Sequence, residues 1–202
     1  MKNKKGKFMK KSLTKVVLAT VLASMPVVAD DLKLLETTKY DFFMGLEMGL
    51  SAAEFTDDSG DYENNGITTY GIKAGAINNN SRMYFSYQYM DAFENSTIRE
   101  GSFQQVTMNV EGLSSAYTVF EGMEHSFFIG GHLGGINLTV NTPFGDSSEF
   151  GSVYGLQGGL LSEFAIGLAI ELGYRYSFSS FTDKDTHLDK LETFYGGLNY
   201  RF

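Results

Sequence analysis

The sequence predicts an all-β protein, an eight-stranded antiparallel up-and-down β-barrel that crosses a membrane. Three observations lead to this fold class: polarity alternates with a period of two along eight segments, no long helical period follows residue 29, and the composition favours strands. The chain has 23 Gly, 17 Phe and 12 Tyr but only 2 Pro and no Trp or Cys. Aromatic residues suit strands and glycines suit the turns between them. The absence of Cys excludes a disulfide scaffold and a thiol nucleophile.

The first 29 residues have the pattern of a secretory signal peptide. They carry seven Lys and no acidic residue, and they end in the apolar run VVLATVLASMPVVA. Cleavage is expected between Ala29 and Asp30, after a small residue. The alternative, a transmembrane anchor, needs roughly 20 apolar residues. This run is shorter and contains Pro26, so we expect export and removal of the segment.

The signal divides the chain into three parts and changes its charge. Residues 1–29 are the signal, 30–41 a short periplasmic segment and 42–202 the barrel domain, with translation starting at Met1 or Met9. Cleavage would remove seven of the 16 basic residues and none of the 24 acidic ones, which leaves a net charge near -15. Nucleic acid is therefore not an expected partner, because phosphate contacts need a basic face.

The first predicted strand shows the alternation most clearly. From Phe42 to Ala52 every even position is apolar, whereas the odd positions from Gly45 to Ser51 are small or charged. Successive side chains of a strand point to opposite faces, so this segment has one apolar and one polar face. Seven further segments alternate in the same way: 68–76, 82–90, 106–117, 126–138, 152–162, 165–178 and 194–202.

The polar face distinguishes a membrane barrel from a soluble sandwich. It is rich in Gly, Ser and single charges, which suits the inside of a narrow barrel better than a solvated sheet. The apolar runs also cover about 10 positions or more, the length at which a tilted strand crosses a bilayer. Short connections (78–81, 162–164) alternate with long polar loops (53–67, 91–104, 139–151 and 180–190), as in outer-membrane barrels. The stretch 117–125 is longer than a tight turn and fits this scheme less well.

The C-terminal segment YGGLNYRF resembles the closing strand of the OmpA/OmpX-like family of eight-stranded outer-membrane barrels of Gram-negative bacteria. YGIKAG, FFIGGHLG and ELGYRY extend this resemblance over the mature chain. It implies a protein of the cell outer membrane, in contact with its lipid and lipopolysaccharide, with a structural or surface-interaction role. It also implies that the terminal strand is a signal for the barrel-assembly machinery, carried by Phe194, Leu198, Tyr200 and Phe202.

Charged residues on the face assigned to the interior must pair or stay hydrated, because buried charges are costly. These interior residues are Glu47, Lys73, Arg82, Glu111, His132, Glu171, Arg175 and Arg201. Glu47 and Lys73 lie on neighbouring strands at similar depth and are the first expected pair. Glu171 and Arg175 are roughly 13 Å apart along one strand, so each needs a partner on another. A polar plug is the favoured interpretation, and a small channel for solutes is the alternative.

Catalysis and metal binding have little support in the sequence. Glu124, His125 and Ser126 supply the residue types of a lipid-modifying enzyme, but consecutive strand side chains diverge, so no catalytic residue, metal or cofactor is expected. Three scattered His give no metal-ligand spacing. The segment 53–66 holds five acidic residues without the calcium-loop signature, so it is interpreted as a solvated exterior loop. An extracellular ligand at this loop is the hypothesis beside it.

Overall fold

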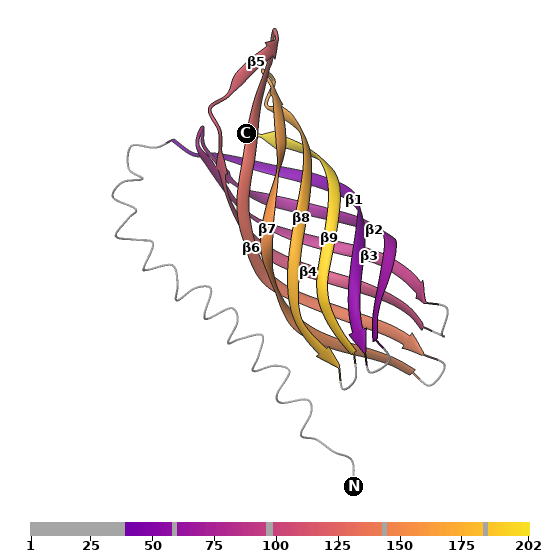
Figure 1. Cartoon of the computed structure of the whole chain (residues 1–202). Helices are drawn as coiled ribbons and strands as arrows, with labels where there is room; N and C mark the ends of the chain where they lie inside the picture. Colours follow the sequence, from indigo (N-terminus) through magenta and orange to yellow (C-terminus); the bar gives the residue numbers. More distant parts are fainter. Residues whose placement is uncertain (1–38, 58–59, 96–98, 143–144, 184–185) are drawn as a thin grey trace, which may run out of the picture. The chain divides into compact units, whose positions relative to one another are not determined.

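A computed structural model describes residues 39–57, 60–95, 99–142, 145–183 and 186–202 (Figure 1). The predicted signal peptide and its cleavage site at Ala29 and Asp30 lie outside this part of the chain. No helix in the described ranges is long and apolar enough to cross a membrane.

The described chain is a closed antiparallel barrel of eight long strands, as predicted. Each long strand pairs with its neighbours in sequence, and pairing of β4 with β6 and of β1 with β9 closes the ring (Figure 1). A ninth, short strand pairs with β6 alone. The strands are β1 (Asp41–Asp57), β2 (Gly60–Ile77), β3 (Ser81–Asn95), β4 (Arg99–Leu113), β5 (Tyr117–Phe120), β6 (Met123–Thr142), β7 (Gly145–Phe164), β8 (Leu168–Asp183) and β9 (Thr186–Arg201).

The C-terminal strand closes the barrel against the first strand. β9 pairs with β1 from Phe43 opposite Arg201 to Asp57 opposite Thr186. Followed through all strand pairs once around the ring, the register that starts at Met44 returns to β1 at Glu54, ten residues further on. Such a stagger accompanies strands tilted by about 40° to the barrel axis.

The two ends of the barrel differ in length and in connection. We call the end at which β1 begins and β9 ends the terminal end, and the opposite end the hairpin end. The prediction of four long polar loops at the hairpin end was wrong for most of their residues. Segments 53–57, 60–67, 91–95, 99–104, 139–142, 145–151, 180–183 and 186–190 continue the strands instead. Strands of up to 20 residues, tilted by about 40°, span roughly 50 Å along the axis.

The outward face carries a continuous band of exposed apolar side chains nearer the terminal end. On β1 the band runs from Phe42 to Leu50, at alternate positions that are 56–62% exposed. The predicted outward positions Phe194, Leu198 and Tyr200 on β9, and Phe202 directly after it, belong to the same band. Beyond Leu50 the outward face of β1 turns polar while the inward face turns apolar, at Ala53 and Phe55.

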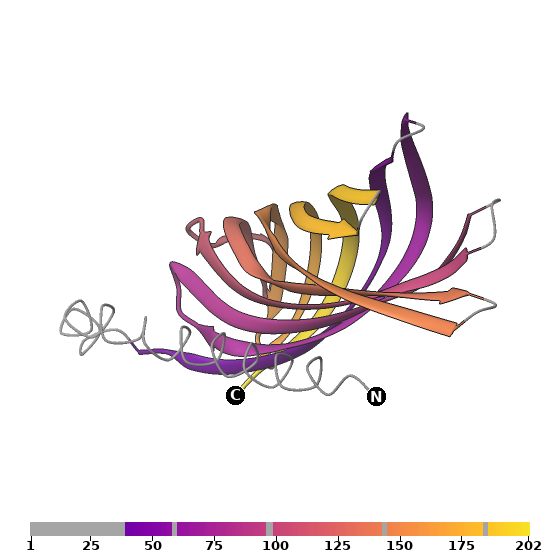
Figure 2. The same cartoon turned by 90° about the horizontal axis from the view of Figure 1, so that it is seen from below.

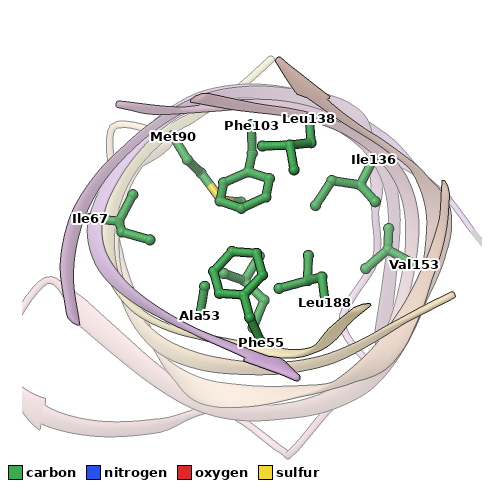
Figure 3. Close-up of a cluster of buried hydrophobic side chains, with 10 residues drawn as sticks. Ala53, Phe55, Ile67, Met90, Phe103, Ile136, Leu138, Val153 and Leu188 are labelled. Atoms are coloured by element: carbon green, nitrogen blue, oxygen red, sulfur yellow. The ribbon is translucent and has the colours of Figure 1, made fainter. Parts of the chain in front are cut away.

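At the hairpin end the interior is an apolar core rather than a polar one. We call this group the hairpin-end cluster: Ala53, Phe55, Ile67, Met90, Phe103, Ile136, Leu138, Val153, Leu188 and Leu191 (Figure 3). The rings of Phe55 and Phe103 stack across it, with centroids 6.1 Å apart. Its members come from β1, β2 and β9 on one side and from β3, β4, β6 and β7 on the other.

Two interruptions in strand pairing divide the hairpin end into two sheets. In the described residues, β2 and β3 pair only from Thr69 and Met90 towards the terminal end, and β7 and β8 only from Val153 and Ser179 towards the terminal end. Figure 2 shows the β1–β2 hairpin standing apart from the β3–β4 hairpin. We call these two interruptions the seams. On their hairpin-end side, sheets β8-β9-β1-β2 and β3-β4-β6-β7 face each other across the hairpin-end cluster, as in a β-sandwich.

A second apolar group closes the interior near the terminal end. This terminal-end cluster consists of Phe43, Ile77, Tyr84, Phe128, Leu161, Ala169 and Tyr195. Between the two clusters the buried inward residues are mostly polar or charged. Among the described residues, the buried polar side chains thus gather mainly between the two clusters, which the alternation pattern alone did not indicate.

Candidate functional site

The polar middle of the barrel holds most of the predicted interior charges, and we call it the polar layer. Within it, Glu47, Glu111 and Glu171 balance Lys73, Arg82 and Arg175, and all six are at most 5% exposed. Each lies at an inward position of its strand, where the period of two places it. Because burying a single unpaired charge costs several kcal/mol, the contribution of this layer to the stability of the fold depends on how completely its charges are paired.

Glu171 connects two cations from the opposite wall. Its Oε2 accepts hydrogen bonds from Lys73 Nζ at 2.8 Å, from Arg82 Nη1 at 2.7 Å and from Asn199 Nδ2 at 3.0 Å. The first expected pair, Glu47 with Lys73, is present only at 3.7 Å, so the nearer carboxylate to Lys73 is that of Glu171. Opposite walls of this narrow interior are therefore within direct bonding reach.

Glu111 and Glu47 extend the same network to either side. Glu111 accepts hydrogen bonds from Arg82 Nε, from Tyr84 OH at 2.7 Å and from Gln157 Nε2 at 2.6 Å. Glu47 pairs with Arg175 Nη1 at 3.3 Å and accepts a hydrogen bond from Gln88. Arg175 Nε also donates to Gln157 Oε1 at 2.8 Å, which joins the two groups. Glu171 and Arg175 do have their partners on other strands.

Aromatic rings cover the cations on the terminal side of the polar layer. The Arg82 guanidinium lies 4.5 Å from the Phe128 ring centroid, and the Arg175 guanidinium lies 4.8 Å from that of Tyr195. Both rings belong to the terminal-end cluster. Cation–π contacts of this kind gain strength where the cation is desolvated. The charge network and the apolar cluster are thus one continuous packing unit.

The remaining predicted interior residues lie apart from the central network. His132 Nε2 lies 2.9 Å from Ser177 Oγ, so it acts in a local side-chain pair. Arg201 lies at the terminal end, partly exposed, and pairs with Asp41 at 2.7 Å and Glu163 at 3.0 Å. Sequence reasoning missed Gln157, which links Glu111 to Arg175; its inward parity on β7 was the available signal.

The predicted separation of His125 from Ser126 has a specific geometry. His125 Nδ1 lies 2.9 Å from Ser162 Oγ on β7, and its ring stacks on Tyr117 with centroids 5.5 Å apart. In the part of the chain that the structure describes, His125 Nε2 has no hydrogen-bond partner, so no carboxylate orients this imidazole. Those residues also contain no group of three or more His, Cys, Asp or Glu able to hold a metal.

Two carboxylates and a lysine meet on the outer face above the apolar band. Lys190 Nζ lies 2.5 Å from Glu54 Oε2 and 3.8 Å from Glu192 Oε1. The hydrogen bond that Lys190 donates to Glu54 raises the pKa of Lys190 above its usual value. Of these three residues, Glu54 belongs to segment 53–66, which the sequence predicts to be an exterior loop, but it lies on strand β1, and Lys190 and Glu192 lie on β9.

The closed ring, the outward apolar band and the buried charges define a small eight-stranded antiparallel β-barrel with an apolar exterior band and a charged interior. Among solved structures the chain is similar to Neisserial surface protein A, with a TM-score of 0.61 and 14% identity over 80% of this chain and 97% of that one. It is also similar to outer membrane protein H of P. aeruginosa, with a TM-score of 0.52 and 22% identity over 80% and 99% of the two chains. No family model and no curated protein matches the sequence. At these identities the similarity shows the fold alone.

Proposed function

We propose that the chain is an integral outer-membrane protein with a structural or surface-interaction role, built as a barrel sealed against solutes. The outward apolar band supports the membrane placement, since residues from Phe42 to Leu50 on β1 would otherwise expose apolar surface to water. The number of long strands is even, and β1 begins and β9 ends at the terminal end. The terminal end would therefore face the periplasm, and the hairpin end the outside.

One observation carries the sealed barrel: the charge-balanced polar layer lies between two apolar clusters. A permeating solute would have to displace both the Phe55–Phe103 stack and the ring of Tyr84 with its neighbours. An interior of eight strands is just wide enough for side chains to fill.

Planar-bilayer recordings of the purified protein test this proposal. No discrete conductance is expected, in contrast to an open porin recorded in parallel. Discrete openings that change in Glu47→Gln or Lys73→Met would overturn the sealed barrel, because they would place the current in the polar layer.

A small channel is the second candidate, and one observation favours it. Several buried atoms in the described part of the polar layer have no hydrogen-bond partner in the protein, among them Arg82 Nη2 and both amide atoms of Gln105. Buried polar groups of this kind commonly bind internal water. A hydrated middle layer would conduct only if both apolar clusters moved, so the recordings above decide between the two candidates.

The location and the surface role have their own tests. Fractionation should recover the protein from outer membranes, with a mature N-terminus at Asp30 if the proposed signal is cleaved after Ala29. Recovery from the soluble periplasm would overturn the membrane placement.

For the surface role, cells in which the acids of segment 53–66 are replaced by their amides should bind less of a cationic peptide such as polylysine than cells with the native chain. Equal binding would remove that segment as a ligand site.

A further inference from the structure

The hairpin of β5 and the start of β6 has no counterpart at the other turns of the terminal end. β5 pairs with β6 from Tyr117 opposite His125 to Phe120 opposite Met123, around a turn in which Gly122 has a φ of 80°. All residues of β5 are exposed, and its other edge lies at the end of the sheet order. Figure 1 shows the hairpin at the same end of the barrel as the C-terminus.

Several contacts hold this hairpin in a fixed direction. The Ser114 N–H donates to the Phe127 carbonyl at 2.8 Å, and the Phe127 N–H donates to Ser114 Oγ at 2.9 Å. Near the tip, the Ala165 N–H of the β7–β8 turn donates to the Gly122 carbonyl at 3.3 Å. The hairpin is therefore tied to the barrel at both its base and its tip.

The exposed side chains of the hairpin continue the outward apolar band. On β6 the band passes through Leu133, Ile129 and Phe127, and the Tyr117 ring stacks on that of Phe127 with centroids 5.7 Å apart. Beyond Tyr117 lie Val119 and Phe120, 60% and 64% exposed. Phe120 pairs with a residue only four positions from Phe127, roughly 13 Å along the strand. The polar pair of His125 and Ser162 lies between Phe127 and the tip, and the Tyr117 ring contacts both His125 and Phe127, so the hairpin continues the band past this pair.

The charges around the hairpin favour an uncharged rather than an anionic surface. Between Arg99 and Arg175 the sequence contains no Lys or Arg, and the hairpin itself carries the acids Glu121 and Glu124. Arg201, which lines the same cavity as Glu124, is paired with Asp41 and Glu163. Anionic lipids attract basic segments, so they would gain nothing here. Tyr and Phe side chains, in contrast, are typical of the girdles at both edges of a membrane barrel.

We infer that the β5–β6 hairpin is an interfacial anchor that inserts Val119 and Phe120 into the periplasmic leaflet of the bilayer. This inference rests on the proposed membrane placement of the barrel and adds to it a specific lipid contact outside the strands that cross the bilayer. The partner is the glycerol and upper acyl region of phospholipids, reached through continuity with the band.

The absence of Trp from the chain makes a direct test possible. Three single-Trp variants of the full chain would be reconstituted into phosphatidylcholine vesicles: Phe120→Trp in the hairpin, Ile129→Trp in the band and Ser115→Trp at the barrel mouth. Ile129 is 73% exposed on the outward face, whereas Ser115 lines a polar cavity of about 290 Å³ together with Asn79 and Glu124. Quenching would be measured with lipids brominated near the headgroup and with aqueous acrylamide.

The inference predicts that Trp at 120 behaves as the Trp at 129 does. Its fluorescence emission should be shifted to the blue and quenched by the brominated lipid. The fraction of fluorescence that is quenched should not change when phosphatidylglycerol is added. Trp at 115 should respond to acrylamide alone. If position 129 is quenched by lipid while position 120 follows position 115, the hairpin is not an anchor and a protein partner becomes the alternative. If position 129 is not quenched either, the proposed membrane placement itself fails.

Discussion

At the scale of single residues, Glu171 links two of the buried cations of the polar layer. It is fully buried and accepts hydrogen bonds from both Lys73 and Arg82. Replacing it with Gln would leave the three cations of the polar layer with two carboxylates, Glu47 and Glu111, and so with one uncompensated buried charge. We expect Glu171→Gln to lower the free energy of unfolding by about 3–5 kcal/mol, the usual cost of breaking a buried ion pair. Urea titration of the barrel in detergent would measure it.

The matched control is the same substitution at the terminal end. Glu163 pairs with Arg201, and both side chains are about one quarter exposed. Glu163→Gln should therefore cost no more than about 1 kcal/mol, as for other solvent-screened pairs. An equal loss in the two variants would mean that the polar layer has no special role in stability.

Phe202 permits a residue-scale prediction about assembly. Its backbone pairs with that of Phe42, but its ring is 65% exposed and stacks on Tyr200 with centroids 6.4 Å apart, so the folded barrel needs the side chain little. If it is an assembly signal, Phe202→Ser should slow the appearance of folded protein in outer membranes while leaving the unfolding midpoint of purified barrel unchanged. Pulse-chase analysis measures the first quantity. Phe127→Ser, at a similarly exposed Phe within β6, is the control and should assemble at the native rate.

The sequence predicted which charges point inward but not which of them meet. Parity along each strand is enough to place Glu47 and Lys73 on the inner face. Their partners depend on the ten-residue stagger and on the width of the closed ring, neither of which a single strand records. This is why Lys73 lies closer to Glu171, from the far wall, than to Glu47 on the neighbouring strand.

At the scale of elements, the seams make the hairpin-end cluster the main connection between its two sheets. Phe103 is fully buried on β4 and stacks on Phe55 of the opposite sheet. Phe103→Ala should cost about 3–5 kcal/mol, as for other large-to-small changes in a core. Exchange of backbone amide hydrogens should accelerate in β3 and β4 on the hairpin-end side of the seam, and should remain slow on its terminal-end side. Phe194→Ala, in the outward band, is the control and should change exchange at neither place.

A bulge where β1 and β2 leave the band supports a second prediction at this scale. The register shifts between Ser51 and Ala52, opposite Gly66, whose φ is 82°. A Cβ at position 66 would meet nothing within 4 Å, so only backbone strain opposes a side chain. Gly66→Ala should cost about 1–2 kcal/mol, the penalty of the left-handed conformation. Gly66→Asn should cost less, because Asn tolerates that region. Thermal melts of the two variants would compare these losses.

Strand existence was predictable and strand length was not. The apolar outer positions of the band produce a strong alternation, which ends at Ala52. From there the alternation continues with inverted polarity, apolar inside at Ala53 and Phe55 and polar outside at Glu54. The apolar outer face ends at this inversion. The sequence therefore predicts loops for the strand residues between the inversion and the hairpin end. The buried odd positions were the signal that could have extended the predicted strands.

At the scale of the whole molecule, closure should make the barrel resistant to detergent. On the terminal side of the two seams every long strand has two partners, so that part of the ring has no open edge at which unfolding could start. Unheated samples in sodium dodecyl sulfate should therefore migrate faster on a gel than boiled ones, because the folded barrel stays compact. Identical migration of the two samples would contradict a closed barrel of this kind.

The two seams also determine how the molecule should respond to mechanical force. A force that pulls the β1–β2 hairpin outward is resisted at the seam with β3 by side-chain contacts. Along β9 the same force is resisted by backbone hydrogen bonds over the whole length of the strand pair. The sheets should therefore part from each other before either sheet loses a strand. A surface protein exposed to flow would yield first by this separation, and it would recover when the load is removed because no strand register has been lost.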